Sequence, residues 1–419
     1  MENSIIIEGG KRIEGETNVQ GSKNAALPLI ASCVALGGTR TLKNIPNISD
    51  ARDLLEILKY FGVKYEFYNG ELKINSESLR QISEKEFETV EKLASKIRSS
   101  TYLIGAVLFR LKSLRLPKPG GCKLGSRPID IHLNALKALG CVVKEKENCY
   151  EIDYEKFTPE SVSFRYPSVG ATINVVLFSM FTPKTIFIEN TAYEPEVDAV
   201  FDFLNKSGRK VERVGSAVKI SESEQNRNIV FYNPFDRIVL GDLLLATAST
   251  RGEIVINEIN PIEIKALIRK ITKSPCKLHI KNDKIMYSAM GRLRGRVSTD
   301  PFPAFPTDLQ AQFAAAALGS GGFCSIKEKV FGNRFEYAKQ LSLMGANVRI
   351  AGRTLFVRQS ELHSAVVTCP DLRGGAGLVI ASLATKGVTE IKNLSIIERG
   401  YEDVVKMYKK LGASLKRSE

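Results

Sequence analysis

LKALGCVVKE, residues 136–145, begins with the apolar spacing of an amphipathic helix and ends with the alternation of a strand, and Gly140 lies between the two patterns. Glycine is typical of a helix end, because it adopts the left-handed backbone conformation that closes the last turn. The same pattern recurs in LKYFGVKYEF at 58–67, LNKSGRKVER at 204–213, LSLMGANVRI at 341–350 and YKKLGASLKR at 408–417. The chain therefore contains copies of one helix–glycine–strand unit.

The spacing of the glycines gives the number of copies. They are Gly62, Gly140, Gly208, Gly345 and Gly412, which lie 78, 68, 137 and 67 residues apart. The gap of 137 residues is two steps with one glycine absent. IRKITKSPCKLHI at 268–280 fits the absent copy, with Pro275 and Cys276 in place of the glycine pair. The period therefore predicts six units.

Six longer segments are apolar on nearly every face, which is typical of helices that are buried all round. They are NAALPLIASCVALGG at 24–38, STYLIGAVLFRL at 100–111, GATINVVLFSMF at 170–181, GDLLLATASTRG at 241–252, QAQFAAAALGSGG at 310–322 and GAGLVIASLATKG at 375–387. The predicted unit is a buried helix, a strand, an amphipathic helix and paired strands. Six units in two groups of three predict the α/β fold class, with two similar domains whose helices pack inside sheets.

The composition favours a soluble, cytoplasmic protein. A chain of 419 residues, with 43% apolar and 25% charged residues, is typical of a globular protein of two domains. The N-terminus lacks a signal-peptide pattern, and no apolar run approaches the roughly 18 residues that span a bilayer. Seven scattered cysteines and three histidines, without a paired Cys-x-x-Cys, favour reduced thiols and disfavour a transition-metal site. We therefore expect no membrane partner, no metal and no cofactor.

The net charge of +14 is compatible with a nucleic-acid partner, but its distribution disfavours one. Much of the charge is lysine on amphipathic helices, as in VVKMYKKLG at 404–412, and no aromatic–basic platform accompanies it. One stretch differs, because from Lys92 to Ile129 it has nine cations and no acidic residue, and it ends in a glycine-rich loop. This stretch predicts binding of a compact anion.

The starts of the six buried helices carry polar residues. These are Lys23 and Asn24, Arg98, Ser168 and Gly170, Asp236 and Arg237, Asp308, and Asp371 and Arg373. A helix N-terminus binds anions, because its N–H groups are unpaired and the dipole is positive there. The alternative is helix capping, which Asp, Ser and Asn do well and Lys and Arg do not.

Seven segments together resemble a known enzyme family. They are GSKNAALPLI at 21–30, GGCKLGSRPIDIH at 120–132, PSVGAT at 167–172, FPAFPTDLQAQF at 302–313, VFGNRF at 330–335, DLRGGAGLVIA at 371–381 and ERGYE at 398–402. They are similar, in order and spacing, to segments of the UDP-N-acetylglucosamine 1-carboxyvinyltransferases, the enolpyruvyl transferases that begin peptidoglycan precursor synthesis. The resemblance runs from about residue 5 to the C-terminus.

The resemblance implies a fold and a division into domains. The family has two inside-out α/β barrels of three repeats each, in agreement with the six units above. By the same resemblance, residues 22–231 form a domain carrying Cys122, and residues 1–21 and 232–419 form a discontinuous second domain. The active site is expected in the cleft between them, in a monomer or weak homo-oligomer.

The resemblance also implies the reaction. Enolpyruvate passes from phosphoenolpyruvate to the 3-hydroxyl of UDP-N-acetylglucosamine by addition and elimination, and phosphate is released. Such chemistry needs a general acid near the enol methylene, a base at the sugar hydroxyl, and cations for the carboxylate and the phosphate.

Matching the motifs position by position assigns roles. Lys23, Arg127 and Arg399 resemble the family's phosphoenolpyruvate clamp, and Asp308 resembles its base at the sugar hydroxyl. Cys122 takes the role of general acid or aids product release. The other implied substrate-binding residues are Asn24, Arg98, Pro128, Ile129, Asp130, Ser168, Val169, Gly170, Phe331, Arg334, Asp371 and Arg373. For Asp308 the alternative is a helix cap, a role that can coexist with that of the base at one helix start. For Arg334, Asp371 and Arg373 the alternative is ordering of the closed site.

Two departures and two alternatives remain. Tyr193 stands where the family pattern leads us to expect arginine, and Gly332 where it leads us to expect glutamate, which puts details of nucleotide contacts and domain closure in doubt. One alternative is the sister enolpyruvyl transferase that acts on shikimate 3-phosphate. The other is a non-catalytic paralogue that binds a UDP-sugar.

Cys122 yields a first prediction. Lys123 and Arg127 should favour the thiolate, and a Gly-Gly-Cys-Lys loop offers no core for the side chain to fill. We expect the epoxide phosphonate fosfomycin to alkylate Cys122 alone, and faster with UDP-N-acetylglucosamine bound. Cys122→Asp should keep activity and lose this sensitivity, since aspartate can supply a proton but forms no thioether. Peptide mapping that finds another cysteine modified, or none, would contradict the prediction.

Overall fold

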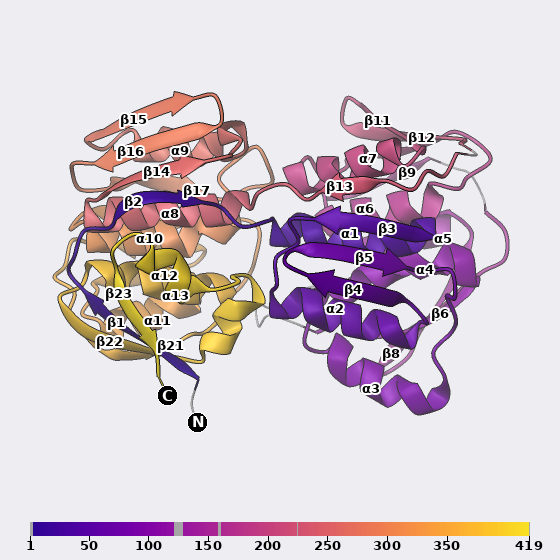
Figure 1. The fold of residues 1–419 in the computed structure, drawn as a ribbon, viewed down its shortest axis with the longest axis horizontal. Coiled ribbons are helices and arrows are strands. Elements are labelled where there is room, and N and C mark those ends of the chain that lie inside the picture. The colour runs from indigo at the N-terminus through magenta and orange to yellow at the C-terminus, as the bar shows by residue number, and fades with distance from the viewer. Residues whose placement is uncertain (1–2, 121–128, 158–160, 224, 419) are drawn as a thin grey trace. The chain divides into compact units, whose positions relative to one another are not determined.

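The structure is a computed structural model that describes residues 3–120, 129–157, 161–223 and 225–418 (Figure 1). The chain forms two compact units. One, the middle unit, contains residues 21–120 and 129–234 of the described chain. The other, the terminal unit, contains residues 3–20 and 235–418.

The six predicted buried helices are present, three in each unit. In the middle unit they are α1 (Lys23–Leu36), α4 (Leu103–Leu111), which follows the short helix η1 (Arg98–Tyr102), and α6 (Val169–Ser179). In the terminal unit they are α8 (Arg237–Thr250), α10 (Gln310–Gly319), which follows η3 (Thr307–Leu309), and α12 (Leu372–Ala384). Nearly all of their residues are buried, so the prediction of helices inside each unit is confirmed.

The six amphipathic helices are also confirmed. They are α2 (Ser49–Tyr60), α5 (Asp130–Ala138), α7 (Pro195–Lys206), α9 (Lys265–Ile271), α11 (Glu336–Leu343) and α13 (Val404–Lys409). The five glycines that follow them all have positive φ, between 79° and 95°, as helix ends of this kind require. Only α9 ends without glycine, at the copy with Pro275 and Cys276. Beyond the repeat lie α3 (Glu84–Ala94), η2 (Pro261–Ile264) and η4 (Leu394–Arg399).

The strands of the described residues form six sheets, one for each repeat. The middle unit contains three of these sheets. The first has the strand order β13 (Val230–Tyr232), β3 (Thr39–Lys43), β5 (Glu71–Asn75) and β4 (Lys64–Tyr68), and the second has the order β6 (Ser113–Pro117), β8 (Cys149–Tyr154) and β7 (Cys141–Glu145). The third has the order β11 (Lys210–Val214), β12 (Ala217–Ser221), β10 (Ile186–Glu189) and β9 (Val162–Ser163). The terminal unit contains the other three sheets. The first has the strand order β15 (Cys276–Lys281), β16 (Lys284–Ala289), β14 (Glu253–Asn257) and β2 (Glu14–Asn18), and the second has the order β17 (Arg294–Ser298), β18 (Phe323–Lys327), β20 (Thr354–Val357) and β19 (Val348–Ala351). The third has the order β21 (Val366–Thr368), β22 (Gly387–Lys392), β1 (Ser4–Gly9) and β23 (Ser414–Arg417).

Strand pairing explains how each unit closes. In three repeats the strand before the buried helix pairs in parallel with the strand after it, as β9 does with β10, β17 with β18, and β21 with β22. Where the chain crosses between units, the strand before the crossing belongs to the unit that the chain leaves. β2 therefore pairs with β14 in the terminal unit, and β13 pairs with β3 in the middle unit. The N-terminal β1 completes the last repeat by pairing with β23.

Small residues let the buried helices approach one another. A Cβ added to Gly105 of α4 would lie 2.7 Å from the Asn174 carbonyl oxygen of α6. In the terminal unit, a Cβ on Gly377 of α12 would lie 3.1 Å from the backbone of Ala311 on α10. Figure 1 shows α8, α10 and α12 gathered inside this unit. Each unit therefore has its own core, built around three closely packed helices.

Substitution of Gly105 tests this packing. We expect Gly105→Ala to lower the free energy of unfolding by about 1–3 kcal/mol, because the new methyl group would overlap a backbone carbonyl that cannot move independently. Gly332→Ala is the matched control, since nothing lies within 4 Å of its added Cβ and its φ is not positive. Denaturant unfolding measures the stability of both variants. Equal denaturation midpoints for Gly105→Ala and Gly332→Ala would contradict the close packing at Gly105.

Candidate active site

Lys23 lies at the start of α1 in the middle unit. The hydroxyl of Ser22 caps this helix by accepting from the Ala25 N–H at 3.2 Å. The Lys23 ammonium lies 2.7 Å from a carboxylate oxygen of Asp50, in the first turn of α2, and both side chains are buried. The cation predicted to bind phosphoenolpyruvate is thus held in place by a carboxylate that the sequence analysis did not identify.

Asn24 and Arg98 contact residues outside the predicted set. The Asn24 amide donates to Glu196 of α7 at 3.4 Å. Arg98 begins η1 and lies near His132 of α5, and burial together with this positive charge lowers the pKa of His132 to about 3. The neutral ring accepts at Nδ1 from the Asn174 amide at 2.8 Å, which leaves its proton on Nε2.

The predicted nucleotide segment lies at the start of α6. Ser168 caps the helix by accepting from the Ala171 N–H at 3.3 Å. A Cβ on Gly170 would lie 2.9 Å from the His132 ring, so glycine is needed for that close approach. Through His132, the starts of α4 and α6 are neighbours. Asp130, at the start of α5, instead pairs with Arg165 at the surface.

Three predicted residues, Cys122, Arg127 and Pro128, lie outside the described residues. Ile129, which follows them, is buried. Of the other six cysteines, five are buried and Cys276 is partly buried, and none is in a disulfide. Burial raises the pKa of Cys141 to about 12, so this thiol stays protonated at neutral pH. The burial of the other five fits the predicted role of small apolar side chains.

Asp308 is the centre of a charged cluster in the terminal unit. Nη2 of Arg334 donates to its Oδ1 at 2.8 Å, and Nη2 of Arg373 lies 3.0 Å from its Oδ2. Both guanidinium groups are buried, but 27% of the Asp308 side chain stays exposed. The arrangement leaves a carboxylate that solvent or a ligand can reach.

The charge of Asp308 follows from these contacts. Burial by itself raises the pKa of Asp308, but the positive charges of Arg373 and Arg334 outweigh it and hold the pKa well below its usual range. The carboxylate is therefore ionised at neutral pH. Among the described residues no backbone N–H donates to it, and the starts of η3 and α10 have no side-chain cap. The helix-cap alternative for Asp308 is therefore wrong.

Asp371 and Arg373 share the start of α12. Asp371 caps the helix by accepting from the N–H groups of Arg373 and Gly374 at 3.0 and 3.1 Å. Burial disfavours the charge on Arg373, but Asp308, Tyr401, Asp236 and Asp242 outweigh it and hold its pKa well above the usual range. Asp371 thus positions the helix start from which Arg373 reaches Asp308.

Arg334, Phe331 and Arg399 complete the predicted set. The Arg334 guanidinium lies 5.1 Å from the centre of the Phe331 ring, and its backbone carbonyl accepts from Gln310 at 3.0 Å. Arg399 ends η4 and is partly buried. The structure therefore brings together Asp308, Arg334, Phe331 and Arg373.

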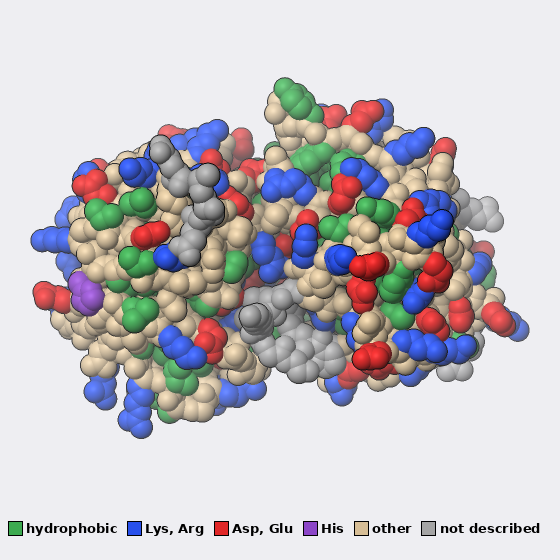
Figure 2. Space-filling view, turned by 90° about the horizontal axis from the view of Figure 1, so that it is seen from below, with side chains coloured by type: hydrophobic (Ala, Val, Ile, Leu, Met, Phe, Trp, Pro, Cys, Tyr) green, Lys and Arg blue, Asp and Glu red, His purple; other side chains and the backbone are tan. Residues whose placement is uncertain are grey.

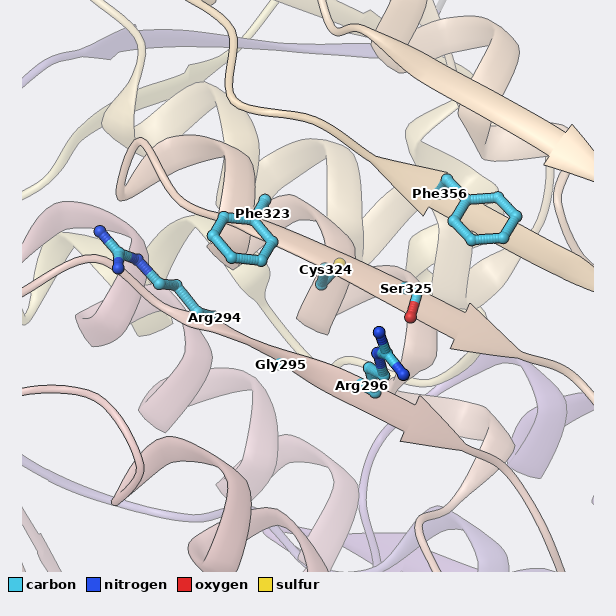
Figure 3. A pocket seen from close by; sticks show the side chains of 7 residues that line it. All are labelled: Arg294, Gly295, Arg296, Phe323, Cys324, Ser325 and Phe356. Carbon is cyan, nitrogen blue, oxygen red and sulfur yellow. The ribbon is translucent and has the colours of Figure 1, made fainter.

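A surface cavity lies away from these residues, elsewhere in the terminal unit. The cavity has a volume of 630 Å³ and lies on the sheet of β17, β18 and β20. Figure 3 shows residues that line it, among them Arg294, Arg296, Phe323 and Phe356. None of its lining residues is a predicted site residue. In Figure 2 the Lys and Arg side chains drawn on each unit are interspersed with Asp and Glu side chains. None of the described helices is long and apolar enough to cross a bilayer.

Asp50, Glu196 and His132 are functional candidates that the sequence analysis missed. Asp50 and Glu196 lie in the first turns of α2 and α7, which are amphipathic helices, whereas the polar helix starts identified in the sequence are those of the buried helices. Their burial was the missing signal, because an acidic residue in an exposed first turn is common.

The chain was compared with known proteins. Residues 7–407 match the family described as EPSP synthase (3-phosphoshikimate 1-carboxyvinyltransferase). A Thermotoga petrophila protein named UDP-N-acetylglucosamine 1-carboxyvinyltransferase is 35% identical over 420 residues, which cover 99% of each chain. A Clostridium acetobutylicum protein named UDP-N-acetylglucosamine 1-carboxyvinyltransferase 1 is 33% identical over 422 residues, covering 100% of both.

Two solved structures share the fold. The enolpyruvyl transferase NikO from Streptomyces tendae aligns with a TM-score of 0.87 at 20% identity, over 100% of this chain and 99% of its own. EPSP synthase from Acinetobacter baumannii aligns with a TM-score of 0.73 at 16% identity, over the whole of both chains. The predicted two-barrel α/β class is therefore confirmed.

Asp308→Asn tests the charged cluster through stability. Two buried guanidinium groups lose their anion, so we expect the free energy of unfolding to fall by about 1–3 kcal/mol at pH 7. Because the folded-state pKa of Asp308 is lowered, its contribution is present at neutral pH and is lost as pH falls below about 4. The difference between variant and wild type should shrink there. Asp283→Asn, at an exposed turn, is the control; equal losses in the two variants would contradict the cluster.

Proposed function

The chain belongs to the enolpyruvyl transferase family, and within it to the UDP-N-acetylglucosamine 1-carboxyvinyltransferases, and on that premise we propose how its residues perform the reaction. The enzyme transfers enolpyruvate from phosphoenolpyruvate to the 3-hydroxyl of UDP-N-acetylglucosamine and releases phosphate. The named relatives, at 33–35% identity over the whole chain, support this acceptor. The solved structures support only the fold, since one of them is an EPSP synthase.

The reaction has two stages. In the first, a proton adds to the methylene carbon of phosphoenolpyruvate, and the sugar oxygen forms a bond to the neighbouring C2 as its own proton passes to a base. In the second, the methyl group returns a proton while the bond from C2 to the phosphate oxygen breaks. The net products are enolpyruvyl-UDP-N-acetylglucosamine and inorganic phosphate, with no oxidation or reduction, so the protein must supply proton transfer and positive charge.

Asp308 is the proposed base, and its geometry carries the proposal. It is ionised, 27% exposed, and fixed by two buried guanidinium groups. A fixed carboxylate can receive the hydroxyl proton without first reorganising. Arg334 and Arg373 also stabilise the negative charge that develops when the sugar oxygen begins to lose its proton.

Lys23 and Arg98 supply positive charge in the middle unit. Lys23 is paired with Asp50, so an arriving phosphate or carboxylate would share the ammonium with that carboxylate rather than meet a desolvated, unpaired charge. The pair holds the ammonium in one place before substrate arrives. We propose that Arg127, Arg399 and Cys122 complete the clamp and the acid role, as the resemblance implies.

The wider setting follows from the reaction. We propose that the enzyme serves peptidoglycan precursor synthesis in the cytoplasm, where phosphoenolpyruvate and UDP-sugars are made. In this proposal both partners are small molecules.

Phosphate release decides between the acceptors. We expect release when phosphoenolpyruvate and UDP-N-acetylglucosamine are present together, and none with either alone or with shikimate 3-phosphate as acceptor. The Asp308→Asn variant serves as the negative control. Its kcat should be lowered about 100-fold or more, because a positioned base is lost. Release with shikimate 3-phosphate would overturn the proposal in favour of the sister enzyme, and binding of UDP-N-acetylglucosamine without turnover would favour the non-catalytic alternative.

A further inference from the structure

Asp242 is a buried carboxylate that the reaction as described does not use. It lies in the middle of α8, within RIVLGDLLLATAST, and only 1% of it is exposed. Its Oδ1 has no hydrogen-bond partner among the described residues. A carboxylate at such a position costs folding free energy, because burial removes its hydration. Its presence in a leucine-rich helix therefore needs another explanation than packing.

A chain of hydrogen bonds joins Asp242 to Asp308. The Tyr401 hydroxyl donates to Oδ2 of Asp242. The same hydroxyl oxygen accepts from Nη1 of Arg373 at 3.3 Å. Nε of Arg373 then donates to Oδ2 of Asp308 at 3.2 Å. Four segments of the chain thus contribute to a path from a carboxylate in the core to the partly exposed carboxylate of Asp308.

The connection addresses a weakness of Asp308 as a base. Two guanidinium groups bond to Asp308 directly, and a carboxylate stabilised in this way holds a proton poorly. Proton transfer to a base is most efficient when the pKa of the base lies near the operating pH. A second anion close to Arg373 offsets part of that guanidinium's charge and makes Asp308 more basic.

We propose that Asp242 is a positioning residue that acts through Tyr401 and Arg373 to keep Asp308 basic enough to accept the proton of the sugar hydroxyl. The inference rests on the proposed role of Asp308. It assigns Asp242 no contact with substrate. When Asp308 takes up the proton and becomes neutral, Asp242 remains as an anion linked to Arg373, so the buried guanidinium keeps a counter-charge throughout the transfer.

The direction of the hydrogen bond between Tyr401 and Asp242 depends on the charge of Asp242, and so does the link to Arg373. With Asp242 ionised, the Tyr401 proton points to it and the hydroxyl oxygen is directed to Arg373. With Asp242 protonated, the carboxyl group becomes the donor to the same oxygen and competes with Arg373 for it. Protonation therefore weakens both the charge and the geometry that hold Arg373.

This change falls near neutral pH. Burial raises the pKa of Asp242 to about 7, and Arg373, Tyr401 and the Gln312 amide of α10 lower it only in part. The groups facing Asp242 are Arg373 of α12, Tyr401 after η4, Tyr408 of α13, and Asp236 at the start of its own helix, whose charge raises the pKa further. Asp242 should thus be mainly ionised above pH 7 and mainly protonated below it.

The main experiment measures kcat and KM of the full-length enzyme from pH 5.5 to 9. Wild-type kcat should rise as pH increases through about 7. Asp242→Asn, which has nearly the same shape but no charge, should lose this rise, with kcat roughly three- to tenfold below wild type at pH 8 and equal to it near pH 6. KM for UDP-N-acetylglucosamine should not change, because Asp242 acts only on the proton transfer.

Two further variants separate the link from the fold. Tyr401→Phe removes the hydroxyl and should give the same loss at pH 8, and the double variant should be no worse than either single one, since both break one chain. It also tests the inference if Asp242→Asn fails to fold. Thr247→Val is the control in the same helix, because its hydroxyl bonds only to the Leu243 carbonyl, and its pH profile should match wild type. Additive losses, or an unchanged profile in Asp242→Asn, would overturn the inference.

Stability gives a readout of the titration that needs no turnover. Because the folded-state pKa of Asp242 is raised, its favourable contribution is complete below the unfolded pKa of about 4 and is lost as pH rises through about 7. Asp242→Asn should abolish that fall in unfolding free energy, and carboxyl ¹³C spectra should lose one group that titrates near pH 7. Lack of turnover by the wild type would overturn the proposed function, whereas absence of this titrating group would overturn the inference even if the enzyme turns over normally.

Discussion

Burying three whole helices inside each unit is the constraint on which the rest of the structure depends. Helices packed this closely exclude water from their sides, so a polar group on them costs folding free energy unless the protein supplies a hydrogen-bond partner. Asn174 illustrates the requirement, because its amide oxygen accepts from the Gly105 N–H and its nitrogen donates to the Thr101 carbonyl. The same constraint makes glycine necessary at Gly105, where the two helices nearly touch.

At the starts of the buried helices, charged side chains lie beside the N–H groups that need partners. These charged side chains are also the ones that can take part in the reaction. The N–H groups at a helix start must be capped, and the positive end of the dipole attracts anions. In α12 one residue, Asp371, provides the cap, and the neighbouring Arg373 is thereby fixed against Asp308. Lys23 at the start of α1 is fixed in a similar way by Asp50. Charged groups held in advance are what proton transfer and phosphate release require.

Closure of the sheets explains why the chain crosses between units where it does. A repeat in which β9 and β10, or β17 and β18, flank a buried helix takes all strands of its sheet from its own stretch of chain. At residues 21 and 235 the helix begins a new unit while the strand before it remains in the old one, so β2 and β13 each complete a sheet whose other strands lie far away in the sequence. The N-terminal β1 fills the equivalent gap in the last repeat.

The sequence by itself determined the repeat, the buried and amphipathic helices and the glycines that end five of them, because these features depend on local periodicity and on backbone conformations that only certain residues adopt. It also placed Lys23, Asp308 and Arg373 at helix starts. Only the tertiary structure decided which groups meet: that Asp50 holds Lys23, that Asp308 binds two guanidinium groups rather than capping its helix, and that Asp242 reaches Asp308 through Tyr401. Those partners lie tens to hundreds of residues apart, and a hydrogen bond or ion pair between them leaves no periodic trace in the chain.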